Sequence, residues 1–544
     1  MPRPTLARKA SALPQFHFST NATDGSPFDI TGQYLLAHAV EPEMCGDGSR
    51  AVQHCDSCAV GVLDLHAAGA PSFRALGETT AWNWQQGAML QWLDGAPEPT
   101  VAYNVRKPGG PPLFRSGRRG LHSSRAPRAA LGEYGAVLLN VRTGATRPLP
   151  MPVCALHSPL PPHPLRAPAE PPRPDFALSL NFNRLALARP EIGYAPAPPH
   201  TAIDYNPEIG ATDAPGDDGI WRVVLASGDA RLLVSLARLA QTRPVESMEG
   251  AVHWVSHVCI SPSGSRFLFL HCWTRRVGDE ARQSSRLYTC DVDGDKLALL
   301  EDAPGLAEGQ ADVHESAAGG AYAYERNARQ VCSPSWKDDR TVLAWSAHGG
   351  GDPRYHLYSN LSVSDGEYKP TAVGVGVLSE NGRASFSPDG CWVAVDTYPD
   401  PSTHESAVLL LDIETQQQLD VGQFYANPRT AKTNRCALSP RWSRDGSRVV
   451  IDSAHENERQ IYILDVDAAI DGSDGSDSEE APDAREEAKQ LREAWPRGVP
   501  KADDLNAGVS MLLGIVSRKN AGGESFGDGD DLAKLMQGGA LGLL

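Results

Sequence analysis

Short stretches of alternating apolar and polar residues recur along the second half of the chain, each next to a tight turn. One copy reads Phe-Ser-Pro-Asp-Gly at residues 386–390 and continues into an apolar stretch at 391–395. Proline presets the first turn position, and Asp-Gly supplies the positive φ of a hairpin, so the phrase predicts strand, turn and strand. Three related copies have their anchor residues at Ile260, Trp336 and Trp442.

The spacing of these copies indicates a repeated unit. The four anchors are 76, 50 and 56 residues apart, as expected for four-stranded propeller blades with loop insertions. Each copy is followed by a further apolar strand, and three of these four strands end in Asp. The four following strands are residues 286–292, 356–358, 408–413 and 460–466. A run of unrelated hairpins in a β-sandwich is the alternative interpretation.

Three weaker copies precede these four. The first covers residues 28–37 and closes at 60–65; the third covers 176–182 and closes at 219–225. The second copy begins at residues 80–87 and closes at 136–141, and we assign its residues 89–92 to the second strand. The sequence therefore predicts an all-β protein, a seven-bladed β-propeller of four-stranded antiparallel blades. Six or eight blades stay open because the first and third copies are weak.

The predicted propeller covers residues 21–467. We expect a flexible segment at residues 1–20 and Pro-rich loop excursions at 106–128 and 158–174, because proline-dense runs cannot join a sheet interior. Residues 468–544 begin with an acidic low-complexity run and predict a largely disordered acidic tail with one or two short helices.

Composition narrows the possible partners and compartments. The net charge of −17 argues against nucleic-acid binding, and no apolar run is long enough to span a membrane. The basic start has no apolar segment after it, and the ten cysteines are scattered, which favours a cytoplasmic protein. An organellar transit peptide stays open. One Cys-x-x-Cys pair, Cys55 and Cys58, has zinc-like spacing, but its role is undecided.

The Ser-Pro-Asp-Gly phrases resemble the TolB-like propeller repeats. The order His253-Trp-Val-Ser-His257 before Ser-Pro-Ser-Gly, together with the last blade, is similar to the oligogalacturonate lyase family. That resemblance implies a seven-bladed propeller that cleaves short acidic pectin fragments by β-elimination. It also implies a histidine base and a divalent metal held mostly by histidines. β-Elimination needs a base and groups that neutralise the uronate carboxylate.

If the residue three before each anchor faces the channel, the ring contains His257, Ser333, Arg383 and Ser439. The resemblance implies that His257 is the base. Serines stand where it would place metal ligands, with Asn434 at its amide position, so we predict no metal and no cofactor. Arg383 is the candidate carboxylate clamp, because a guanidinium binds carboxylate bidentately.

Further candidates for substrate contacts are Arg184, Arg435 and Asn434, besides Ser333 and Ser439. Two functions follow. One is carbohydrate-directed: the protein either binds acidic oligosaccharides or cleaves them by β-elimination without a metal. The other is a non-enzymatic scaffold whose loops or acidic tail bind protein partners. A channel lined by His257 and Arg383 would favour the first function, and a plugged channel would favour the second.

Overall fold

The structure is a computed structural model, and it describes most of the predicted propeller. The described residues are 7–11, 15–19, 25–41, 52–67, 71–107, 133–158, 175–195, 214–275, 277, 283–303, 330–361, 368–426 and 435–471. Most of the two Pro-rich segments and the tail from residue 472 onward, with its expected helices, lie outside this set.

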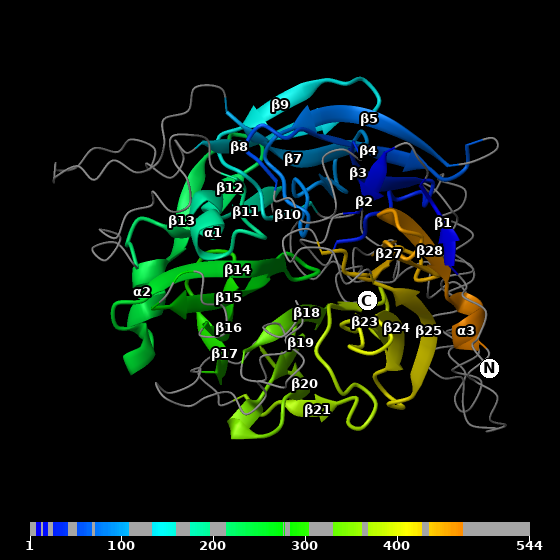
Figure 1. Ribbon diagram of the computed structural model, residues 1–544. Helices are drawn as coiled ribbons and strands as arrows, with labels where there is room; N and C mark the ends of the chain where they lie inside the picture. Colours follow the sequence, from blue (N-terminus) through cyan, green and yellow to red (C-terminus); the bar gives the residue numbers. More distant parts are fainter. Residues whose placement is uncertain are drawn as a thin grey trace, which may run out of the picture.

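Seven four-stranded antiparallel sheets form a propeller ring, as the repeat predicted (Figure 1). The first three blades are β2 (Phe16–Phe18), β3 (Tyr34–Val40), β4 (Cys58–Asp64) and β5 (Ser72–Thr79); β6 (Gln91–Trp92), β7 (Thr100–Arg106), β8 (Tyr134–Asn140) and β9 (Thr146–Leu149); and β10 (Ala155–His157), β11 (Phe176–Ser179), β12 (Gly219–Val224) and β13 (Ala230–Ser235).

The next three blades contain the clearest sequence repeats. They are β14 (Val252–Ile260), β15 (Arg266–Thr274), β16 (Ser284–Asp291) and β17 (Ala298–Ala303); β18 (Cys332–Asp338), β19 (Thr341–Ser346), β20 (Arg354–Tyr358) and β21 (Thr371–Val373); and β22 (Ala384–Phe386), β23 (Trp392–Asp396), β24 (Glu405–Asp412) and β25 (Gln418–Tyr425).

The seventh blade joins the two ends of the propeller. It contains β26 (Arg441–Trp442), β27 (Arg448–Ser453) and β28 (Gln460–Asp465), and its outermost strand is β1 (Ala7–Lys9). Ala7 pairs with Leu464 and Lys9 with Tyr462. Residues 7–9 and 16–18 were expected within a flexible segment outside the propeller, whereas the structure places them in blades 7 and 1. A three-residue strand has no hydrophobic period by which to recognise it.

The second blade also differs from its expected strand order. We assigned residues 89–92 to the second strand, but Gln91–Trp92 form the first strand, β6, which pairs with β7. Residues 81–87 before it form a linking loop that we call the axial loop. The Trp92 anchor thereby occupies the same position as Trp336 and Trp442 in their blades.

The anchor residues connect neighbouring blades through a repeated hydrogen bond. The Trp336 indole Nε1 donates to the Cys259 carbonyl at 3.1 Å, and the Trp442 indole donates to the Ser385 carbonyl at 3.0 Å. Trp92 donates to the Pro27 carbonyl at 2.9 Å. Each acceptor directly precedes the anchor of the previous blade, so one residue type fixes three blade interfaces in the same way.

A second repeated contact comes from the fifth residue of the second strand. His38 Nε2 accepts from the Ala88 amide at 3.0 Å, and Asn104 Oδ1 accepts from the Val153 amide at 2.7 Å. The carboxylates Asp396 and Asp452 accept in the same way from the amides of Ser439 and Ser19, both at 2.8 Å. Each contact holds the chain next to the first strand of the following blade.

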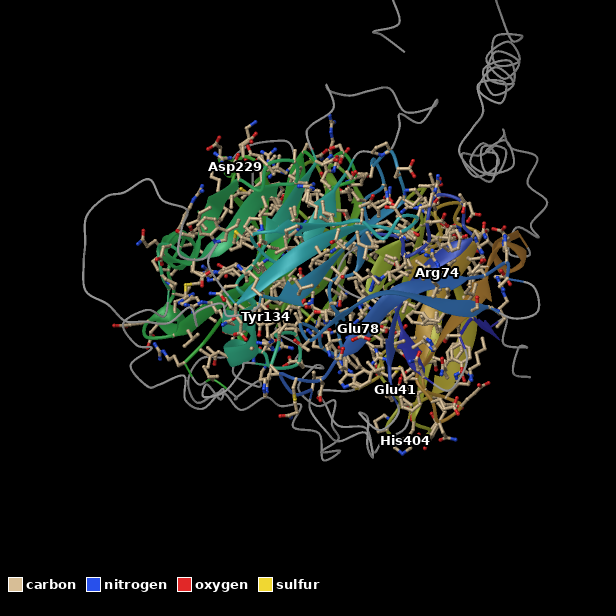
Figure 2. The ribbon with its side chains drawn as sticks, turned by 90° about the horizontal axis from the view of Figure 1, so that it is seen from above. Glu41, Arg74, Glu78, Tyr134, Asp229 and His404 are labelled. Atoms are coloured by element: carbon tan, nitrogen blue, oxygen red, sulfur yellow. The ribbon has the colours of Figure 1, made fainter. Side chains whose placement is uncertain are left out.

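The connections between second and third strands gather on one side of the ring, which we call the BC face. Figure 2, turned by 90°, shows Glu41 after β3 and His404 before β24 on this side, with Asp229 of the β12–β13 hairpin opposite. Because strands alternate in direction, the links between blades also lie on the BC face. The axial loop is one such link.

In the part of the chain that the structure describes, three short α-helices accompany the sheets. α1 (Phe182–Ala188) is buried along its length and contacts β14, α2 (Leu236–Gln241) follows β13, and α3 (Asp467–Asp471) contacts β25. Asn181 caps α1 by accepting from the amides of Asn183 and Arg184. No helix among the described residues is both long and apolar enough to cross a membrane.

Candidate functional site

Three of the four predicted ring residues have the same unusual backbone. His257, Ser333 and Ser439 have φ values of 52°, 51° and 49°, in the left-handed region that non-glycine residues rarely adopt. Met89, three residues before Trp92, has a φ of 55° and is the equivalent position of blade 2. The pairing register shifts across His257 and across Ser333, so each lies in an irregular part of its first strand.

The His257 side chain is exposed, and the pKa of its imidazole is strongly lowered. It is the exposed residue of β14, between buried neighbours. Desolvation by the surrounding protein, together with the smaller effect of the positive charges of Arg189 and Arg383, lowers the pKa of His257 to about 4. Both properties fit a ring that faces the propeller axis, where solvent reaches it but protein displaces most of the water. The imidazole is therefore neutral at pH 7, and its Nδ1 lies 3.0 Å from Ser256 Oγ.

Arg383 lies directly before β22, and about a third of its side chain (32%) is exposed. Its amide donates to Asp396 Oδ1 at 2.6 Å, and its Nη1 lies 3.9 Å from Asp396 Oδ2. Burial raises the pKa of Asp396, and Arg383 partly offsets this. The guanidinium is thus anchored at one side by a buried carboxyl group and keeps a solvent-exposed part.

Gln85 of the axial loop reaches Arg383 from across the ring. Arg383 Nη2 donates to Gln85 Oε1 at 3.2 Å, and Gln85 Nε2 donates to the Arg435 carbonyl at 2.9 Å. Blades 2 and 6 are three places apart in a ring of seven, so this contact crosses the middle. Sequence reasoning missed Gln85, because no local pattern distinguishes it from any other loop glutamine.

Arg189 is the second residue that sequence reasoning missed. It is the C-cap residue of α1, and its charge acts on His257 and on the Cys272 thiol. It pairs with Glu191 and donates to Gln283 Oε1 at 3.3 Å. Arg189 lies in the long insertion between β11 and β12, which extends over the BC face. The length of this insertion is the sequence feature that could have pointed to it. We define the axial cluster as His257, Arg383, Arg189 and Gln85.

The remaining predicted residues fall into different surroundings. Arg184 is buried in an ion pair with Asp218 (2.9 Å) and donates to the His253 carbonyl, which commits its guanidinium to the protein interior. Arg435 is also buried; its guanidinium stacks over Tyr398, and its carbonyl accepts from Gln85. Asn434 lies outside the described residues.

The residues at the ring positions do not suit a divalent metal. His257 contributes one imidazole, whereas Ser333 is half-buried and Ser439 is buried, with a side-chain oxygen that has no hydrogen-bond partner. Serine hydroxyls are poor ligands for such ions. Within the described ranges, no three His, Cys, Asp or Glu side chains converge as a metal site would require.

The Cys55 and Cys58 pair does not form a shared thiol site. Cys58 is fully buried in the core, and burial raises the pKa of its thiol, whereas Cys55 is exposed. A metal at this loop would need both thiolates on one side. The nine cysteines in the described part of the chain are free thiols.

The axial cluster can bind an anion more readily than it can abstract a proton. Two guanidinium groups lie near a neutral imidazole that can donate or accept one hydrogen bond. A general base works best with a pKa near the working pH, and a pKa of about 4 makes His257 a weak base at pH 7. The arrangement therefore suits recognition of a carboxylate beside a hydroxyl-rich group.

Comparison with known proteins identifies similar folds but no family. No family model and no curated protein sequence matches the chain. Oligogalacturonate lyase from Vibrio parahaemolyticus is 11% identical with a TM-score of 0.46, covering 85% of this chain and 94% of that one. An oligogalacturonate lyase in complex with manganese is 12% identical with a TM-score of 0.45 and the same coverage.

A putative TolB from Agrobacterium tumefaciens is 12% identical with a TM-score of 0.29, covering 84% of this chain and 93% of that one. These neighbours are of the two kinds expected from the repeat phrases. At this identity the likeness concerns the fold alone, because such folds host many unrelated activities.

Proposed function

We propose that the protein binds carboxylate-bearing oligosaccharides, such as uronate oligomers, at the axial cluster. The observation that carries this proposal is the solvent-exposed, neutral His257 whose pKa is depressed in part by two nearby guanidinium groups. A carboxylate ligand would bind the solvent-exposed part of the Arg383 guanidinium, on the side away from Asp396. His257 would accept or donate one hydrogen bond to a neighbouring hydroxyl.

Binding without turnover is the form of the proposal that the electrostatics support. Elimination would require His257 to take a proton from carbon, and a base of pKa about 4 is poorly matched to that step at pH 7. We therefore expect no ultraviolet-absorbing unsaturated product when the protein is incubated with acidic oligosaccharides.

The test is calorimetric titration with galacturonate oligomers and with neutral oligosaccharides of the same length. Arg383→Ala should weaken acidic-oligomer binding about tenfold or more, because a charge-assisted bond to carboxylate contributes roughly 1.5–3 kcal/mol and 1.4 kcal/mol is tenfold. Arg142→Ala is the matched control, since Arg142 is largely exposed and pairs only weakly with Glu98 at 3.4 Å. Equal binding of neutral and acidic oligomers, or no effect of Arg383→Ala, would contradict the proposal.

A protein-interaction scaffold is the second candidate, and one observation favours it. The link between β21 and β22 on the BC face exposes Val375 by 62% and Val377 by 38%, which is unusual for apolar side chains close together. If no oligosaccharide binds, a Val375→Asp and Val377→Asp double variant that loses a defined protein partner would support this candidate instead.

A further inference from the structure

The contact between Gln85 and Arg383 restricts how the guanidinium can bind anything else. A carboxylate binds arginine bidentately either end-on, through Nη1 and Nη2, or side-on, through Nε and Nη2. Both forks use Nη2, and each takes one of its two hydrogens. Gln85 Oε1, at 3.2 Å from Nη2, accepts one of them. One of the two forks therefore remains for a ligand.

Gln85 is well placed to impose this restriction because the axial loop holds it rigidly. The Gln85 amide donates to Asn83 Oδ1 at 3.0 Å, and Asn83 Nδ2 donates to the Gly193 carbonyl at 3.2 Å. The Trp84 carbonyl accepts from Arg459 at 3.0 Å. At the end of the loop, Gly87 has a φ of 61°, and a Cβ there would lie 2.4 Å from the His38 ring. The loop is thus tied to blades 1, 3 and 7.

The amide of Gln85 adds no second negative charge beside Arg383, whose Nη1 already lies 3.9 Å from Asp396 Oδ2. A carboxylate at the same position would pair with the guanidinium and cancel the positive charge that lowers the His257 pKa. Glutamine provides the acceptor without the charge. Gln85 is itself buried, with 6% of its surface exposed.

We propose that Gln85 determines the specificity of the axial site. It holds Arg383 with a neutral acceptor, so that one bidentate fork stays available to a single carboxylate and no acidic side chain besides Asp396 is added at the guanidinium. The inference rests on the proposed function for its ligand, but its effect on His257 is independent of any ligand. Gln85 is a positioning residue, since it acts through Arg383.

Four variants separate the charge from the loss of contacts. Gln85→Glu and Gln85→Met both remove the bond to the Arg435 carbonyl, but only Gln85→Glu adds a carboxylate beside Arg383. Gln86→Glu adds the same charge one residue along the loop, where the amide of Gln86 bonds Asn83. Arg383→Ala in the Gln85→Glu background shows whether the effect passes through the guanidinium. Thermal melting verifies that each variant folds.

The first measurement needs no ligand. A pH titration of the His257 imidazole signals by NMR should show a higher His257 pKa in Gln85→Glu than in Gln85→Met or Gln86→Glu. This rise should disappear in the Arg383→Ala background. The second measurement is calorimetry with a galacturonate trimer, for which Gln85→Glu should bind at least about tenfold more weakly than Gln85→Met.

The outcomes distinguish the two proposals. If the wild-type protein binds the trimer and all Gln85 variants bind it equally, the role of Gln85 is wrong while the proposed function stands. If the wild-type protein binds no acidic oligomer, the proposed function fails and the His257 titration alone decides the role of Gln85. A His257 pKa that is the same in Gln85→Glu and Gln86→Glu overturns that role.

Discussion

The anchor position of each blade is occupied by different residue types, and only some of them can form the hydrogen bond to the preceding blade. The anchor position holds tryptophan in blades 2, 5 and 7, with its indole bonded to the preceding blade, but Phe386 in blade 6 and Phe28 in blade 1. Phenylalanine is therefore compatible with the backbone at this position. The indole contributes the hydrogen bond in addition to the packing of its ring.

Trp336→Phe removes that hydrogen bond together with part of a buried ring. We expect the free energy of unfolding to fall by about 2 kcal/mol, because a lost hydrogen bond between buried groups typically costs about 1–3 kcal/mol. Urea unfolding followed by circular dichroism measures it, with an unchanged m value as evidence that the denatured state is the same. A loss under about 0.5 kcal/mol would show that the ring alone matters here.

The candidate site could be predicted only where the repeat specified it. The three-residue offset from each anchor identified His257, Ser333 and Ser439, and these share the left-handed backbone. The same offset would also have identified Met89 had the first strand of blade 2 been recognised. Gln85 and Arg189 could not be found in this way, because they reach the axis from a link and an insertion that the repeat does not contain.

At the scale of elements, the strands with a clear period were predicted and the strand that closes the ring was not. β1 pairs with β28, far away in sequence, through the Ala10 amide and the Ile461 carbonyl at 2.8 Å. Lys9 adds ion pairs with Glu456 at 2.9 Å and Glu458 at 3.5 Å, although such partly exposed pairs contribute little. The residues around β1 contain no sequence pattern that identifies β28 as its partner.

Removing residues 1–10 should open the seventh blade. We expect a loss of at least about 2 kcal/mol in the free energy of unfolding, from hydrogen bonds that contribute about 1 kcal/mol each and from exposure of the apolar side chains clustered with Ala10. Differential scanning calorimetry measures the change in Tm. Arg8→Ala is the control, since it shortens an exposed side chain and keeps the strand backbone. A truncated protein as stable as Arg8→Ala would contradict a role in closure.

For the whole molecule, buried histidines and net charge act in opposite directions as the pH falls. Burial lowers the pKa of His38 to about 3 and of His253 to about 4, and it lowers that of His271 well below its ordinary value. His253 Nδ1 and His271 Nε2 lie 2.9 Å apart within the core. In contrast, the net charge of −17 becomes smaller with acid, which relieves self-repulsion over a screened surface.

The histidines should dominate between pH 6.5 and 5. Below pH 6.5 these histidines bind protons in the unfolded chain but stay neutral in the folded chain. The stability present above that pH is therefore progressively lost. For His38 alone the loss at pH 5 is about 2 kcal/mol, at 1.36 kcal/mol for each pH unit below 6.5. Urea unfolding between pH 5 and 8 should show this decrease.

His38→Asn dissects that pH dependence, because asparagine is the residue that blade 2 uses at the equivalent position, Asn104. The variant should lose about 2 kcal/mol less than the wild type between pH 7 and pH 5. His66→Asn, in the exposed turn after β4, serves as the control. Identical pH profiles for His38→Asn and the wild type would refute the assignment.

The pairing of β1 with β28 also sets an order of events during synthesis. β1 is synthesised before the other strands of the ring, yet its partner is made more than 450 residues later. At 5–20 residues per second, about 20 to 90 seconds pass during which six blades can form while the strand has no native partner. The ring can therefore close only at the end of translation of the seventh blade. Until then, the nascent propeller presents an open edge at which a chaperone could bind.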